Sequence, residues 1–340
     1  MRIAVDAMGG DYAPAAVVLG GIEAAKIANG DFEIVLVGDQ AQIEQELHRH
    51  FRTHNLRISI HHASEQIEMG EAPAAALKRK PDASINVAYR LQAKGEVDAV
   101  ISAGNTGAAM ASALLELGRI HGVKRPGIGS LLPNGSGAAM LIDVGANVDC
   151  KPQHLLQFGL MGSIYMNRIL SIDRPRVALL SIGEERGKGN DAAVAAYDLL
   201  AESHLNFVGN VEGRDLLKDV ADVVICDGFV GNIILKFAES IGGVFSFHMK
   251  RQIGKNIFRN LGAFLLKPTF TGLRKVFDYE EYGGAPLLGV NGVSIICHGG
   301  SRPKAIKNAV REAAKMIREG VNQIIRKEMQ SLNGAPIAHH

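Results

Sequence analysis

Short apolar runs alternate along the chain with longer segments whose apolar residues recur at helical spacing. The runs are rich in Val and Ile, as strands buried on both faces are. They lie at residues 2–6, 33–38, 57–61, 97–102, 127–132, 138–144, 176–182, 205–209, 222–226 and 293–297. The helical segments lie at 14–28, 40–51, 82–94, 106–118, 153–170, 190–202, 229–247 and about 303–331. This alternation predicts an α/β fold with a helix-flanked, largely parallel sheet.

In four places an apolar run breaks at a glycine and an asparagine follows within a few residues. The four segments are 100–107, 141–147, 179–190 and 224–232. Each predicts a buried strand that turns sharply into a helix, where exposed backbone N–H groups favour an anion. Gly-Asn is also ordinary turn chemistry. Four such turns at the carboxyl ends of strands nevertheless match the place where open α/β sheets bind ligands, so they predict a phosphate-binding crevice.

The third turn, residues 183–190, is the richest in polar residues. Lys188 lies between two glycines, as expected of an ammonium that contacts phosphate on a bendable loop. Asn190 suits the N-cap of the following helix, and the neighbouring Glu184 and Glu185 are candidate anchors for Lys188 or Arg186. The alternative, a mobile charged surface loop, leaves the flanking glycines unexplained. In the fourth turn, Asn232 places an amide at a helix start, where it can hold an oxyanion.

The first predicted strand ends in a loop with two glycines between two carboxylates. Gly9 and Gly10 permit a positive φ and a close approach of the backbone to a ligand. Asp6 and Asp11 flank them. We interpret this segment as a substrate-binding loop in which a carboxylate orients the ligand. An Asp-capped strand–helix turn is the alternative, and for Asp11 alone it is equally well supported.

Several classes of function have no support in the sequence. No G-x-G-x-x-G follows the first strand, and no P-loop, G-x-S-x-G or H-E-x-x-H sequence occurs, so we expect no nucleotide cofactor and no metal. A net charge of +2, 5% aromatic residues and no Trp argue against a nucleic-acid partner. Three scattered cysteines indicate a reducing cytoplasm. We expect Cys226 and Cys297 to be buried, and Cys150 to lie in a loop that leaves open whether it is exposed. The chain begins with a strand-like run and no apolar run approaches the roughly 20 residues that span a bilayer, so we expect neither a signal peptide nor a membrane span.

Residues 240–277 contain no Asp or Glu and many basic residues. Around 250–277 apolar residues follow helical spacing, and the polar face opposite them is basic. Because protein surfaces normally mix charges, this stretch indicates a membrane-binding or acidic-partner-binding insertion; a core helix with a solvated basic face is the alternative. The residues that we expect to bind are Lys255, Phe258, Arg259, Leu261, Phe264 and Leu265. We interpret residues 1–331 as one catalytic domain and 332–340 as a flexible tail.

Together, several of these loops resemble one family. The matching segments are 4–14, 102–107, 181–185, 188–190, 210–213, 227–232, 282–289 and 298–301. They are similar to the bacterial phosphate acyltransferases of phospholipid synthesis, in order from residue 1 to about 330. The resemblance implies a dimeric, Rossmann-like fold similar to phosphate acetyltransferases and to isocitrate and isopropylmalate dehydrogenases. It also implies that an acyl group passes from acyl carrier protein to inorganic phosphate. The enzyme would lie peripherally at the inner face of the cytoplasmic membrane and supply a glycerol-3-phosphate acyltransferase.

This reaction suits a site built of Gly, Asn and Lys. Phosphate is a competent nucleophile and a thioester is already activated, so positioning and oxyanion stabilisation suffice. Our hypothesis assigns phosphate to Lys188 and phosphate or the oxyanion to Asn232, with Asn105 and Asn190 completing the cradle. His298 is either a proton donor to the departing thiol or a structural histidine beside two glycines.

Two other functions stay open at this point, and a third has only weak support. One is a phosphate acetyl- or butyryltransferase that uses coenzyme A thioesters. The other is a non-catalytic scaffold at the membrane surface. A dehydrogenase would rest on fold analogy alone. The turn at residues 145–147 receives no role beyond a structural one.

Overall fold

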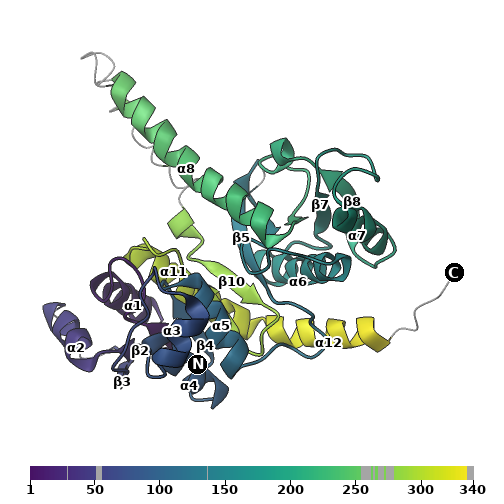
Figure 1. Cartoon of the computed structure of the whole chain (residues 1–340). Coiled ribbons are helices and arrows are strands. Elements are labelled where there is room, and N and C mark those ends of the chain that lie inside the picture. The colour runs from purple at the N-terminus through teal and green to yellow at the C-terminus, as the bar shows by residue number, and fades with distance from the viewer. Residues whose placement is uncertain are drawn as a thin grey trace.

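The computed structural model describes residues 1–28, 30–50, 56–135, 137–253, 262, 265–266, 272 and 279–334 (Figure 1). The strands are β1 (Arg2–Asp6), β2 (Glu33–Gly38), β3 (Ile58–His62), β4 (Ala99–Ser102), β5 (Gly127–Asn134), β6 (Gly137–Ile142), β7 (Arg176–Leu180), β8 (Asn206–Val211), β9 (Val223–Ile225), β10 (Ala285–Leu288) and β11 (Val293–Ile296). The helices are α1 (Ala15–Ile27), α2 (Gln40–Arg49), α3 (Pro73–Arg79), α4 (Ser84–Ala93), α5 (Thr106–Glu116), α6 (Pro152–Leu170), α7 (Asp191–Ala201), α8 (Gly228–Ile253), α11 (Pro303–Arg318) and α12 (Val321–Gly334), with 3-10 turns at Gly213–Asp215 and Tyr279–Glu281.

One sheet of strands, in the order β3-β2-β1-β4-β11-β10-β5-β6-β9-β7-β8, runs through two lobes (Figure 1). The pairings β11–β10, β10–β5 and β5–β6 are antiparallel, and the other pairings are parallel. The predicted largely parallel, helix-flanked sheet is therefore confirmed. The three antiparallel steps reverse the direction of β6, β9, β7 and β8 relative to β4. The Gly-Asn turn after β4 consequently lies at the opposite sheet edge from the turns after β6, β9 and β7, which share an edge.

The core consists of strand residues buried on both faces and of one face of each flanking helix. In the amphipathic α11, Ile306, Val310 and Ala313 are fully buried, and α11 packs against α1. The two helices approach closely at Gly20, where an added Cβ would lie 2.5 Å from the Cβ of Ile306. Burial of a Val or Ile side chain contributes roughly 1.5–3 kcal/mol, so this contact stabilises the lobe that holds β1–β4.

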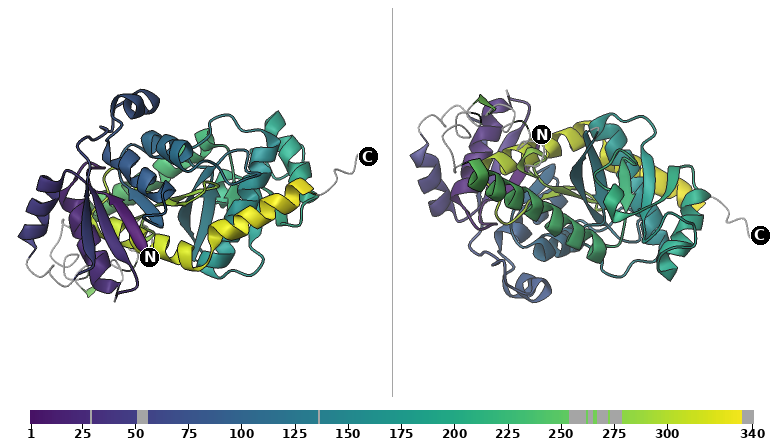
Figure 2. Two further views of the ribbon diagram at one scale, coloured as in Figure 1. Left: turned by 90° about the horizontal axis from the view of Figure 1, so that it is seen from below. Right: turned by 90° about the horizontal axis from the view of Figure 1, so that it is seen from above.

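The predicted helix at about 303–331 is two helices. It breaks after α11 at Gly320, which adopts a left-handed φ of 63°, the conformation with which helices commonly end. Helix α12 then packs against α6 in the other lobe and links the two lobes (Figure 2). The sequence pattern also missed α3, whose seven residues are too few for a clear period, and β10, whose Pro286 argues against a strand.

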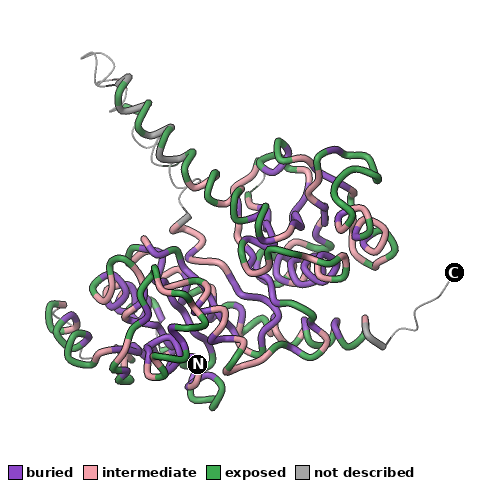
Figure 3. Tube along the Cα trace, in the orientation of Figure 1, coloured by how far each residue is buried: buried purple, intermediate pink, exposed green. Residues whose placement is uncertain are grey.

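Helix α8 extends away from both lobes, and much of its length is exposed (Figures 1 and 3). Large apolar side chains lie on it in the open: Phe229, Ile233, Phe237, Val244 and Phe247. Within the described part of the chain, no helix combines the length and apolar character needed to cross a bilayer. The predicted binding residues Lys255, Phe258, Arg259, Leu261 and Phe264 lie outside the described residues. Leu265 is described and is 71% exposed. The domain boundaries proposed from the sequence stay a prediction.

Replacing Gly20 by Ala should destabilise the fold. Alanine normally stabilises a helix interior by about 1 kcal/mol relative to glycine, but here its Cβ would also lie 2.8 Å from the carbonyl oxygen of Pro303. We expect the free energy of unfolding to fall by about 1–3 kcal/mol, measured by urea denaturation. Gly21→Ala on the same helix is the matched control, because its Cβ would first meet a leucine methyl at 3.3 Å. Equal stabilities for the two variants would contradict this account.

Candidate functional site

The turn after β9 presents Asn232 in the second turn of α8. Its side chain is exposed and has no hydrogen-bond partner in the described part of the chain. The start of α8 lies directly on the turn after β6: Gly228 N donates to Asn147 O at 2.7 Å. A Cβ on Gly231 would lie 1.9 Å from the carbonyl oxygen of Asp143. Glycine is therefore required at 231, and it sets how closely the amide of Asn232 approaches this turn.

The side chain of Asp143 accepts the hydrogen bonds that fix the turn after β6. The carboxylate is fully buried. Its Oδ1 accepts the N–H groups of Ile128, Gly145 and Ala146 at 3.0–3.1 Å. Its Oδ2 accepts the backbone N–H of Asn147 at 2.7 Å and the Asn147 side-chain amide at 2.9 Å. Burial raises the pKa of Asp143, and the N–H donors oppose that rise. The sequence pattern did not single out Asp143; the available signal was a carboxylate at the end of an apolar strand, just before a glycine turn.

The loop that carries Lys188 is anchored at three points. Asn190 is the N-cap of α7, as predicted, with its Oδ1 accepting Ala193 N–H at 2.9 Å. The hydroxyl of Ser181 donates to the Lys188 carbonyl at 2.8 Å, and the amide of Asn210 donates to the carbonyl of Glu185 at 2.9 Å. The loop thus has a defined backbone around an exposed lysine.

The charged side chains of this loop do not pair as expected. Arg186 pairs with Asp198 of α7 at 2.8 Å rather than with a glutamate of its own loop. Lys188 is exposed, and among the described residues its ammonium has no ion-pair partner. A lysine in this state keeps its charge available for an anion.

In the other lobe, the carboxylate of Asp6 holds the first loop to the turn after β4. Asp6 is buried, and its two oxygens accept the hydroxyls of Ser84 and Ser102, each at 2.6 Å. Burial raises the pKa of Asp6. A Cβ on Gly9 would lie 2.6 Å from Asp6 Oδ2, and Gly10 has a φ of 108°, so both glycines serve the close approach of two loops. A role of Asp6, Gly9 and Gly10 in binding substrate stays a prediction.

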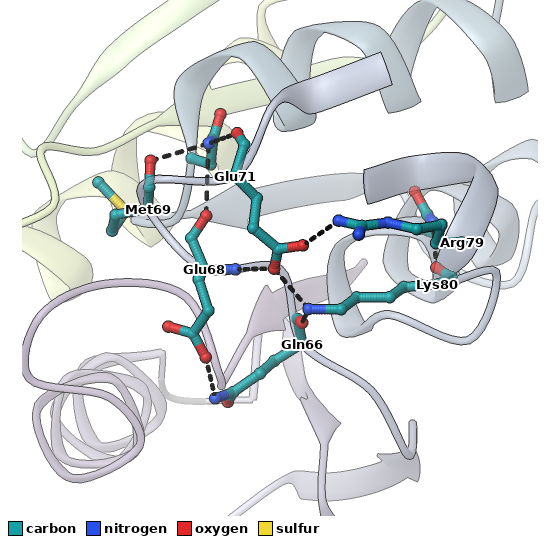
Figure 4. A network of polar contacts seen from close by, with 8 residues as sticks. Gln66, Glu68, Met69, Glu71, Arg79 and Lys80 are labelled. Carbon is teal, nitrogen blue, oxygen red and sulfur yellow. Dashed lines mark hydrogen bonds and ion pairs between the residues drawn. The ribbon is translucent and has the colours of Figure 1, made fainter. Parts of the chain in front are cut away.

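Both the oxygen and the nitrogen of the Asn105 side chain make hydrogen bonds within the protein. Its Oδ1 caps α5 by accepting Ala108 N–H at 3.0 Å, and its amide donates to the carbonyls of Met69 and Glu71, both at 3.0 Å. The segment that receives these bonds is itself ordered by Glu71, which binds Lys80 and Arg79 (Figure 4). These contacts give Asn105 a structural role, and the predicted contact with phosphate would require breaking them.

His298 follows β11 and is exposed. Its Nδ1 accepts the N–H of Gly300 at 3.0 Å. The neutral ring therefore carries its proton on Nε2. This arrangement suits a proton donor and also fits the structural alternative.

A cavity of about 190 Å³ lies between the lobes and is lined by both Asn232 and His298. Thr106, next to Asn105, lines the same cavity, whereas Lys188 and Asn190 do not. The turn with Lys188 shares a sheet edge with the turns after β6 and β9, because β6, β9 and β7 are adjacent parallel strands. Of the predicted site residues, Asn232 and His298 line this cavity, and their roles stay a prediction.

The cysteines are not candidates for nucleophiles. Cys226 and Cys297 are buried, as expected. Cys150 is half-buried, and burial raises its pKa to about 12, so it is a neutral thiol near pH 7. Within the described residues, no three His, Cys, Asp or Glu side chains form a group able to hold a metal ion.

Comparisons with known proteins agree on a family. Residues 1–324 match the family model described as "Fatty acid synthesis protein". The chain is 50% identical over 332 residues to the phosphate acyltransferase of Pelotomaculum thermopropionicum, covering 98% of this chain and 96% of the relative. It is 52% identical over 323 residues to that of Heliobacterium modesticaldum, covering 95% of each chain.

Two solved structures share the fold. A phosphotransacetylase from Streptococcus pyogenes superposes with a TM-score of 0.63 at 16% identity, covering 94% of each chain. A branched-chain phosphotransacylase from Enterococcus faecalis superposes with a TM-score of 0.59 at 14% identity, covering 93% of this chain and 99% of that one. The predicted Rossmann-like fold, similar to that of the phosphate acetyltransferases, is confirmed.

Asp143→Asn should destabilise the turn after β6, against which the first turns of α8, with Asn232, pack. The variant would place an NH₂ group against N–H donors, leaving buried groups unpaired at a cost of about 1–3 kcal/mol. We expect a lower midpoint in urea denaturation. Asp149→Asn, an exposed position in the same loop, is the control and should unfold like the wild type. A wild-type midpoint for Asp143→Asn would show that the carboxylate does not organise the turn.

Proposed function

The chain belongs to the phosphate acyltransferase family, and on that premise we propose that it moves a long-chain acyl group from acyl carrier protein to inorganic phosphate. The products are an acyl phosphate and the free carrier thiol. The observation that carries the proposal is the pair of exposed side chains Lys188 and Asn232, which lack partners among the described residues and extend from turns at one sheet edge. An apolar cavity begins beside Asn232.

The reaction requires one bond to form and one to break. A phosphate oxygen attacks the thioester carbonyl carbon, the tetrahedral intermediate collapses, the C–S bond breaks, and the departing thiolate takes a proton. Lys188 binds the phosphate, and its Nζ offsets the negative charge. Asn232 donates its amide to phosphate or to the oxyanion. His298 is the candidate proton donor, through Nε2. Asn190 retains a side-chain N–H beyond its capping oxygen and can also donate to phosphate.

One feature supports a carrier protein as the donor. The basic stretch at about 250–277 has the charge that attracts an acidic carrier. Coenzyme A thioesters are the alternative donors.

Location and assembly are further parts of the proposal. The exposed apolar residues along α8, such as Phe237 and Phe247, would be covered in a homodimer. The basic, apolar stretch after α8 would hold the enzyme at the inner surface of the cytoplasmic membrane. There the acyl phosphate would pass to a glycerol-3-phosphate acyltransferase. A non-catalytic scaffold would bind liposomes without cleaving thioesters.

Lys188→Ala and Asn232→Ala should each lower kcat by about 100- to 1,000-fold, the range seen when one oxyanion donor is removed. Acyl phosphate trapped with hydroxylamine measures turnover. For Lys188→Ala we also expect a higher KM for phosphate. Arg186→Ala is the control, because this exposed cation on the same loop is paired with Asp198. Near-normal activity of both alanine variants in a folded protein would remove Lys188 and Asn232 from the mechanism.

Donor preference separates the two enzyme hypotheses. With the same acyl chain, we expect kcat/KM to be at least about tenfold higher for acyl carrier protein than for coenzyme A, with the difference shrinking as salt screens the basic stretch. A Lys255→Glu and Arg259→Glu double variant should lose activity with the carrier and keep it with coenzyme A. Equal losses with both donors would count against carrier recognition by this stretch.

A further inference from the structure

The cavity beside Asn232 has a shape and lining that the phosphate chemistry does not explain. Its walls are mainly apolar: Ile128, Leu131 and Leu132 come from β5, Val144 from the turn after β6, and Leu235 and Ile241 from α8. Phosphate needs N–H donors and cations rather than Leu and Ile. The apolar walls therefore serve another part of the substrate.

The cavity follows α8. Asn232, Leu235, Ala238 and Ile241 are all lining residues, and at steps of three positions the line that they form turns gradually around the helix as it rises. At a rise of about 1.5 Å per residue, the path from Asn232 to Ile241 is about 13 Å long. The cavity is thus elongated, and its one exposed amide, that of Asn232, lies at the start of this path.

The charges along this path cancel, because Lys236 and Glu239 form an ion pair. A neutral, elongated and apolar space suits a hydrocarbon chain. It suits a nucleotide poorly, because burying phosphates without cations is costly. The volume of about 190 Å³ exceeds the roughly 150 Å³ of an apolar cavity that takes benzene, so several methylene groups fit.

We propose that this cavity binds the acyl chain of the donor, with the thioester carbonyl at Asn232 and the hydrocarbon running along α8 past Leu235 toward Ile241. This inference rests on the proposed function. Leu235 lies one turn from Asn232 and contacts the methylenes nearest the reacting carbon. Ile241 contacts the chain farther out and discriminates between chain lengths.

Two phenylalanine substitutions test this order along the path. Leu235→Phe narrows the cavity near the carbonyl and should lower kcat/KM for both octanoyl- and palmitoyl-carrier protein. Ile241→Phe narrows it farther out and should lower kcat/KM for palmitoyl-carrier protein by about tenfold or more, the effect of roughly two methylenes losing their apolar contacts. Activity with the octanoyl donor should stay within about twofold of wild type. Ile241 is 39% exposed, so the fold should accept this change.

Leu115→Phe on α5 is the control, since this position is 76% exposed and does not line the cavity. Its octanoyl-to-palmitoyl ratio should equal that of the wild type. An unchanged ratio in Ile241→Phe, together with normal palmitoyl activity in Leu235→Phe, would overturn the proposed chain path while leaving the acyltransferase activity intact. Failure of the wild type to form acyl phosphate from any donor would instead refute the proposed function.

Discussion

The site depends on the packing of the first turns of α8 against the turn after β6. Gly231 leaves no space for a Cβ above the carbonyl of Asp143, and the Asp143 carboxylate holds the backbone N–H groups of that turn from inside. Since a buried carboxylate is costly unless its oxygens are paired, the turn has one favourable arrangement. The position of Asn232 follows from it, and so does the wall of the cavity that α8 forms.

The reversal of strand direction explains how two lobes serve one site. If all strands ran in parallel, the turns after β4 and β9 would lie along a single edge, and the site would be a shallow groove. The antiparallel strands β10 and β5 instead join two blocks of parallel strands, β3-β2-β1-β4-β11 and β6-β9-β7-β8. The strands of one block run in the opposite direction to those of the other. The cavity lies between the blocks, with His298 from one and Asn232 from the other. A cleft between two lobes can cover part of a hydrocarbon and shield that part from water, which an open sheet edge cannot do.

Most strands and helices were predictable because Val- and Ile-rich runs and amphipathic spacing are local signals. The break at Gly320 was missed because the apolar stripe continues across it from α11 into α12. Strand β10 was missed because Pro286 argues against a strand, yet β10 forms antiparallel pairs with both neighbours. For the candidate site, the sequence identified the turns but not their direction in the sheet, which depends on long-range pairing. Asp143 was missed because its five donors become visible only when the turn is folded.

An asparagine near the start of a helix makes different hydrogen bonds depending on its position relative to the first helical residue. Asn105 and Asn190 precede the first residue of α5 and α7, so each uses its Oδ1 to cap an unsatisfied backbone N–H. Asn232 is the fifth residue of α8, beyond the N–H groups that need a cap, and its side chain is left exposed. Asn147 lies well before α6, and its amide donates to the carboxylate of Asp143 in its own turn and to the carbonyl of Pro126 before β5. Of these four amides, only that of Asn232 has both its donor and its acceptor unused among the described residues, and its NH₂ group is the part that can bind a transient oxyanion.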